Sequence, residues 1–149
     1  MTGAVRVDDT GSEIGTWDLA TLTRLKAQGD VERRVLTHNP VPAGPSSALI
    51  STSLLEHVGG WNPDLRYFAD WDLWIRLSRA ADPVLVDEPL VRYRVWDGQM
   101  ISDRRLGWEA LDTIRANNAE RRNELGVSPL DDRVILWILQ GEMLSLIHI

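Results

Sequence analysis

The sequence predicts an α/β protein with short mixed strands followed by C-terminal helices. Short apolar runs at residues 4–7, 84–87 and 90–96 are separated by segments with the spacing of amphipathic helices. Of the 149 residues, 44% are hydrophobic and 26% are charged, which is the composition of a folded domain with its own core. We therefore expect residues 1–102 to form a mixed α/β part and residues 103–149 a helical extension.

The composition excludes several kinds of partner and site. A formal net charge of −6 argues against nucleic acid as a partner, because phosphate binding favours clustered Lys and Arg. The chain has no cysteine, so it has neither a disulfide framework nor a thiolate metal site. His38, His57 and His148 lack the spacing of metal ligands, and no zinc site is expected.

The location of the protein is inferred from its apolar segments. No Lys- or Arg-led apolar segment opens the chain, so no signal peptide is expected. The apolar run Val134–Leu139 falls far short of the roughly 18 residues of a membrane span. These features predict a cytoplasmic protein and leave open a peripheral association with the inner face of the membrane.

The first part of the chain predicts a strand, a turn and a helix. Ala4–Val7 reads as the strand, and Asp8–Gly11 has the residues of a turn. Asp18 is expected to cap a helix that runs to Gln28 and stops at Gly29.

The middle of the chain predicts a loop, a strand and a short helix. His38–Pro45 is rich in Pro and reads as the loop, and Ser47–Ser51 reads as a brief buried strand. Ser51 is also expected to cap a helix that ends at Gly59–Gly60, where a positive φ is often needed. The turn residues Asn62–Asp64 follow.

A second helix is predicted at Asp70–Ala80, and Pro83 ends it. Two short strands, Val84–Asp87 and Leu90–Trp96, are expected after it. The helical extension is predicted to contain one helix over 104–125 and another from Pro129 onward, with Ser128 as its cap.

Asp70 is an acidic residue at the head of an apolar helix face. A rotation of about 100° per residue places Leu73, Trp74 and Leu77 on the same side. The carboxylate is therefore either a helix cap or a general base that faces a cleft, and helix geometry alone favours the cap. The two roles can coexist.

Asp72 points to the opposite side of this helix, near Arg76 and Arg79. We expect it to be a solvated ion-pair partner, which contributes only a few tenths of a kcal/mol.

Four segments of the chain, in order and with their spacing, resemble the C-terminal half of the inverting family-two glycosyltransferases. They are Ser46-Ser47-Ala-Leu-Ile, Val58-Gly-Gly-Trp61, Asp70-Trp-Asp-Leu-Trp-Ile-Arg-Leu77 and Glu88-Pro-Leu-Val-Arg-Tyr-Arg94. The resemblance covers a bit over a third of the chain.

The resemblance implies a partial GT-A fold and a sugar donor activated as a nucleotide diphosphate. The resemblance also implies transfer by direct displacement at the anomeric carbon, with inversion. The role of the base that deprotonates the acceptor hydroxyl maps onto Asp70. The acceptor implied is a carbohydrate, a lipid-linked molecule or a protein.

Three further residues become candidates for substrate binding through the same resemblance. Gly60 and Trp61 would line the acceptor pocket, although a capping glycine and a core aromatic residue are the more favoured explanation of them. Arg94 would hold the donor phosphates or brace the acidic helix, and the alternative is an exposed Arg on an edge strand.

The sequence departs from the family pattern at two positions. Ala69 stands where a Glu usually precedes the base, and Trp96 stands where a His often lies and is often assigned as a metal ligand. Family members also need an Asp-x-Asp that binds manganese or magnesium, and no such motif appears in a plausible place. We therefore expect a divalent metal in the complete enzyme, with ligands mostly in a missing N-terminal half, and we expect this chain alone to be inactive.

Two other functions remain open from the sequence. A non-catalytic binding or interaction domain that keeps the fold is favoured by Ala69 and Trp96. A helical regulator that works through the helices after Ser102 would require residues 100–149 to fold and bind alone.

Overall fold

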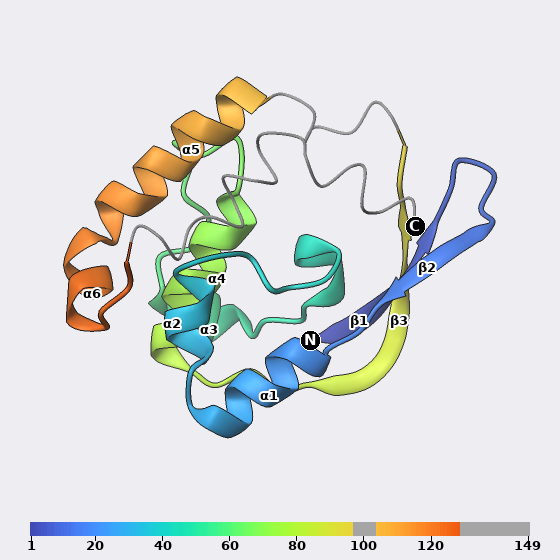
Figure 1. Ribbon diagram of the computed structural model, residues 1–149, viewed down its shortest axis with the longest axis horizontal. Helices are drawn as coiled ribbons and strands as arrows, with labels where there is room; N and C mark the ends of the chain where they lie inside the picture. The colour runs from blue at the N-terminus through green and yellow to red at the C-terminus, as the bar shows by residue number, and fades with distance from the viewer. Residues whose placement is uncertain (97–103, 129–149) are drawn as a thin grey trace.

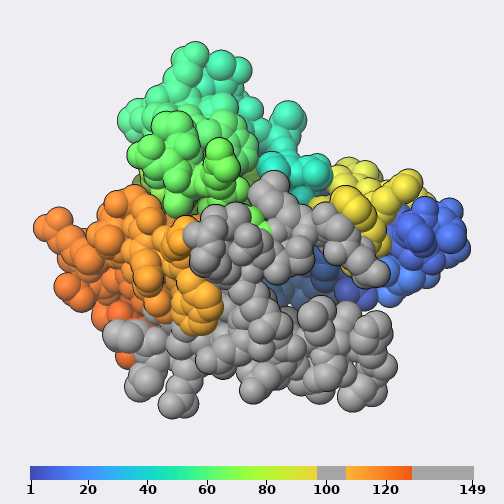
Figure 2. All heavy atoms as spheres, turned by 90° about the horizontal axis from the view of Figure 1, so that it is seen from above, coloured from blue at the N-terminus to red at the C-terminus, as the bar shows by residue number. Residues whose placement is uncertain are grey.

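The computed structural model describes residues 1–96 and 104–128 and confirms a mixed α/β architecture. A three-stranded sheet lies beside a group of helices, and the β1–β2 hairpin and the helices α5 and α6 lie at opposite ends of the molecule (Figures 1 and 2).

The sheet has the strand order β2–β1–β3. The central strand β1 (Thr2–Val7) pairs antiparallel with β2 (Glu13–Trp17) and parallel with β3 (Val86–Arg94). Ala4 of β1 is paired with Trp17 of β2 on one side and with Val91 of β3 on the other. The strands at the start and at the end of the α/β region are therefore neighbours in one sheet.

The expected strand at residues 4–7 and the turn after it are confirmed. The Asp8 Oδ1 atom accepts hydrogen bonds from the backbone N–H groups of Thr10 and Ser12, both at 2.9 Å, and closes the turn. The prediction missed β2, because its residues are exposed on both faces and give no apolar alternation.

The expectation of two strands at 84–87 and 90–96 is wrong, because β3 is one continuous strand. Pro89 lies inside it. Proline is tolerated there because the register with β1 shifts between Val86 and Val91, so Pro89 lies in an irregular, unpaired part of the strand.

The first helix, α1 (Ala20–Gln28), ends as expected, but its N-cap position is Leu19 and Asp18 lies one residue before it. Asp18 Oδ1 accepts a hydrogen bond from Ala20 N at 3.0 Å, and Gly29 ends the helix with a φ of 69°. A short helix that was not expected, α2 (Val31–Val35), follows directly.

The prediction of a buried strand at 47–51 is wrong. Residues Gly44–Ser47 form a 3-10 helix, η1, and residues 48–50 belong to no helix and pair with no described strand. Leu49 is 97% exposed. The apolar run Ala-Leu-Ile gave a strand signal, but periodicity cannot tell whether a neighbouring strand is there to pair with it.

The helix α3 (Thr52–His57) confirms the predicted cap, since Ser51 Oγ accepts a hydrogen bond from Leu54 N at 3.3 Å. Gly59 and Gly60 follow with φ values of 85° and 68°, and the turn at 62–64 is present. The segment around α3 projects from one side of the molecule (Figure 2).

The helix α4 (Ala69–Ala80) is confirmed to within one residue of its predicted start. The expected solvation of Asp72 is wrong, although its pairing with Arg76 is right. Asp72 is only 4% exposed, because the turns around α3 cover this side of the helix. α4 is therefore buried around most of its circumference rather than along one face.

The single helix expected over 104–125 is interrupted, and α5 (Arg104–Asn117) and α6 (Ala119–Glu124) are separate. Asn118 lies at the break, where its Nδ2 donates to Ile114 O at 2.7 Å and its Oδ1 accepts from Arg79 at 2.7 Å. An Asn side chain that bonds to the backbone in this way competes with helix continuation. The helix expected from Pro129 lies outside the described residues.

One hydrophobic core joins α1, α2, α4 and α5. Its members include Leu25, Val35, Trp71, Trp74, Leu111 and Ile114. The described part of the predicted helical extension thus packs into the same core as the α/β part. Among the described residues, no helix is long and apolar enough to cross a membrane.

We predict that Leu111→Ala destabilises the whole chain by about 2–5 kcal/mol, because Leu111 is 1% exposed and the change leaves a cavity. Urea unfolding followed by tryptophan fluorescence measures this. The matched control is Leu49→Ala, which deletes the same atoms from a fully exposed site and should change the free energy of unfolding by less than about 0.5 kcal/mol. Equal effects of the two variants would show that α5 is not part of the core.

Candidate functional site

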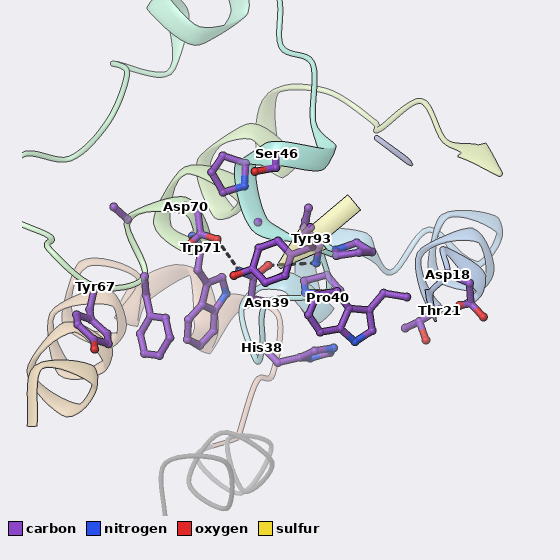
Figure 3. Close-up of a pocket in the computed structure, with 18 of the residues that line it drawn as sticks. Asp18, Thr21, His38, Asn39, Pro40, Ser46, Tyr67, Asp70, Trp71 and Tyr93 are labelled. Carbon is purple, nitrogen blue, oxygen red and sulfur yellow. Dashed lines mark hydrogen bonds between the residues drawn. The ribbon is translucent and has the colours of Figure 1, made fainter. Parts of the chain in front are cut away.

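A cleft of about 990 Å³ lies between the sheet and the start of α4 (Figure 3). Its walls come from the end of β2, the loop at 38–46, the segment 66–71 and β3. Six aromatic residues line the cleft, namely Trp17, Trp61, Tyr67, Phe68, Trp71 and Tyr93. Tyr67 and Trp71 are buried in the core, so the aromatic faces open to a ligand are those of the other four. Aromatic faces of this kind suit the flat apolar faces of a sugar ring.

Asp70 lies half-buried in the wall of this cleft (Figure 3). Its Oδ1 accepts a hydrogen bond from the backbone N–H of Trp71 at 2.8 Å, and its Oδ2 accepts one from Asn39 Nδ2 at 3.1 Å. The residue at the N-cap position of α4 is Phe68, so Asp70 lies inside the first turn rather than at the cap. It nevertheless satisfies one of the free N–H groups of that turn, and both carboxylate oxygens keep a lone pair.

The backbone around Asp70 is held in uncommon conformations. Ala43 and Phe68 both have a φ of 54°, in the left-handed region that non-glycine residues rarely adopt, and both line the cleft. Gly44 has a φ of 55°, and a Cβ atom there would lie 2.9 Å from Asp70 Oδ2. Such strained positions cluster at functional sites, where the surrounding structure has to hold them.

His38 also lines the cleft (Figure 3). Burial, together with the nearby positive charge of Arg34, lowers the pKa of His38 to about 4. The imidazole is therefore neutral near pH 7, and its Nδ1 lies 3.2 Å from Thr37 Oγ1.

The other predicted site residues are placed differently. Trp61 is 46% exposed and lines the cleft, so it is not a core residue. Gly60 ends α3, as a capping glycine does, and its carbonyl accepts a hydrogen bond from Arg76 at 2.7 Å. Gly60 is not among the residues that line the cleft.

The structure does not bring Arg94 to Asp70. Arg94 and Arg92 lie on one face of β3 and reach the turn after β1, where Arg92 pairs with Glu13 at 2.9 Å. Tyr93 points the other way, into the cleft (Figure 3). The strand alternation separates Tyr93 from its two neighbours, and the aromatic residue is the one that reaches the site.

Sequence reasoning missed Asn39 and Tyr93. Asn39 comes from a loop 31 positions before Asp70, and no local pattern indicates that the two side chains meet. Tyr93 had a signal, because it alternates with Arg92 and Arg94 and therefore faces away from both.

Asp72 and Arg76 fix the position of Trp61. Arg76 forms an ion pair with Asp72 at 2.7 Å and also donates to the carbonyl oxygens of Val58 and Gly60, at 2.6 and 2.7 Å. The chain leading into Trp61 is thereby tied to α4.

Within the described residues, no three side chains of His, Cys, Asp or Glu come together in a way that could hold a metal ion. Asp70 and Asp72 have the spacing of an Asp-x-Asp, but Asp70 lines the cleft and Asp72 does not. These residues do not fit a metal site.

Comparison of the chain with family models, with curated proteins and with solved structures gave no match.

We predict that the chain loses about 1–2 kcal/mol of stability between pH 7 and pH 5 through His38. The pKa of His38 is lower in the folded state than in the unfolded chain, so the unfolded chain binds the proton more readily and unfolding is favoured as the pH falls. The measurement is urea unfolding at both pH values for the wild type and for His38→Gln. The variant should lose this part of the pH dependence.

Glu32 affects the free energy of unfolding only at lower pH, because hydrogen bonding from Arg121 lowers its pKa below 4.5. Its stabilising effect is lost only as the pH falls below that value. If the free energy of unfolding of His38→Gln changes between pH 7 and pH 5 by the same amount as that of the wild type, His38 is not the cause of the pH dependence.

Proposed function

We propose that the chain is the acceptor-side part of an inverting glycosyltransferase that uses a nucleotide-diphosphate sugar, with Asp70 as the general base. The observation that carries the proposal is the oriented carboxylate of Asp70 in the wall of an aromatic cleft. The four segments that resemble family-two glycosyltransferases support it, and the GT-A fold is part of the proposal.

The surroundings of Asp70 suit a base that acts on an acceptor hydroxyl. Among the described residues its two hydrogen-bond donors, Asn39 Nδ2 and Trp71 N, are neutral, and no ion pair to Asp70 is formed there. In the proposed reaction Asp70 takes the hydroxyl proton while the acceptor oxygen forms a bond to the anomeric carbon. The bond from that carbon to the nucleotide diphosphate breaks, and the configuration inverts.

The remaining parts of the enzyme are proposed to come from a preceding half. This half would supply the nucleotide site and most ligands of a manganese or magnesium ion, which would stabilise the leaving diphosphate. The DNA upstream of Met1 is therefore expected to continue in frame and to encode two nucleotide-binding strands and an Asp-x-Asp.

A binding domain without catalysis is the second candidate, because the aromatic cleft could hold a sugar without transferring it. Ala69 and Trp96 favour this candidate, since both depart from the family pattern.

We predict that Asp70→Asn in the complete protein lowers turnover by about 10²–10⁴-fold or more, the usual contribution of a positioned base. Asn keeps an oxygen that can accept the Trp71 N–H bond but cannot take a proton. Turnover is measured as release of the nucleotide diphosphate from a panel of nucleotide sugars. Asp64→Asn is the matched control, because Asp64 is exposed in the turn before α4.

Near-wild-type turnover of Asp70→Asn would exclude the base assignment. Complete absence of turnover in the unaltered protein, with sugar binding retained, would favour the binding domain instead.

A further inference from the structure

A second, smaller pocket of about 320 Å³ adjoins the cleft. We call it the side pocket. Trp61 lines both cavities, so the two meet at this side chain. Trp61 is 46% exposed, which leaves much of the ring available for contact.

The side pocket holds an unused hydrogen-bond acceptor. Asp72 lines it although only 5% of its side chain is exposed, and both hydrogen bonds from Arg76 go to Oδ2. Among the described residues, none donates a hydrogen bond to Oδ1. Asp72 Oδ1 is not among the buried polar atoms left without a partner in the described residues, so it is accessible at the side pocket and can accept a hydrogen bond from a ligand there.

Two amide side chains supply further polar groups around the side pocket. Asn62 uses its Oδ1 to accept from Asp64 N at 3.0 Å, which leaves its Nδ2 as a donor. Asn117 is exposed at the end of α5 and makes no side-chain hydrogen bond within the described part of the chain.

The charges in the side pocket are already compensated. Arg76 directs four N–H bonds to Asp72 and to two backbone carbonyls, and Arg79 donates to Glu32 and Asn118. The pocket therefore suits a neutral ligand rich in hydroxyl groups rather than an anion. An aromatic wall with Asn and Asp groups around it offers an apolar face together with hydrogen-bond partners, which suits a sugar ring.

We propose that the side pocket is a second sugar subsite, so that the acceptor is a glycan of at least two rings that crosses Trp61. The inference rests on the proposed function, because it assigns the cleft beside Asp70 to the acceptor. It narrows the acceptor to the end of an existing sugar chain.

The test is calorimetric titration of the 149-residue chain with one-ring and three-ring sugars of the gluco, manno, galacto and N-acetylglucosamine series. In at least one series the three-ring sugar should bind about tenfold or more tightly than the single ring, because it fills both cavities. Asn117→Ala should raise the Kd of the three-ring sugar about fivefold, the worth of one hydrogen bond, and leave the single-ring Kd unchanged. The control Asn123→Ala, at an exposed position of α6, should change neither value.

Equal Kd values for one and three rings, or an unchanged three-ring Kd in Asn117→Ala, would overturn the second subsite and leave the role of Asp70 standing. Absence of binding in every series would also overturn it. The proposed function is tested separately, by the turnover of Asp70→Asn in the complete protein.

Discussion

The helical half of this protein depends on side-chain donors that satisfy the carbonyl groups at the ends of its short helices. The last carbonyls of a helix have no partner within the helix, and when buried they must find one elsewhere. Trp71 Nε1 donates to Val35 O and Arg122 to Leu36 O, each at 2.5 Å, at the end of α2. Arg76 serves the end of α3 in the same way. Each donor belongs to another helix, so the groups that close one helix also join it to its neighbour.

These hydrogen bonds between helices position the candidate site. Trp71 is the residue next to Asp70, and its bond to Val35 holds the first turn of α4 against α2. The carboxylate of Asp70 is thereby held within hydrogen-bond distance of Asn39, which lies in the loop before η1. At the other edge, the bonds from Arg76 to the end of α3 hold Trp61 between the cleft and the side pocket. The two sides of the proposed acceptor site are therefore positioned by hydrogen bonds between the helices.

The sequence predicted the features that local chemistry decides. Ser51 as a cap, Gly29 as a stop and the pairing of Asp72 with Arg76 all follow from residue type and spacing, and all are confirmed. The errors arose where distant neighbours decide. Ser47–Ser51 has the composition of a strand but no described partner, and Asp72 is buried because segments remote from it in sequence cover its side of α4. The meeting of Asn39 with Asp70 depends on the path of a proline-rich loop, which periodicity does not describe.

The environments of Asp70 and Asp72 separate their roles, although the two lie on one helix. Asp72 is bound through two hydrogen bonds to a guanidinium, and its charge is needed to compensate that cation in a buried place. Protonating Asp72 would leave Arg76 without its counter-charge, so Asp72 is poorly suited to take a proton from a substrate. Within the described residues, Asp70 accepts hydrogen bonds from two neutral groups, and it lies in the wall of a cleft. Two carboxylates in such different settings take different tasks, and a base that receives a proton during the reaction is better placed where no cation depends on it.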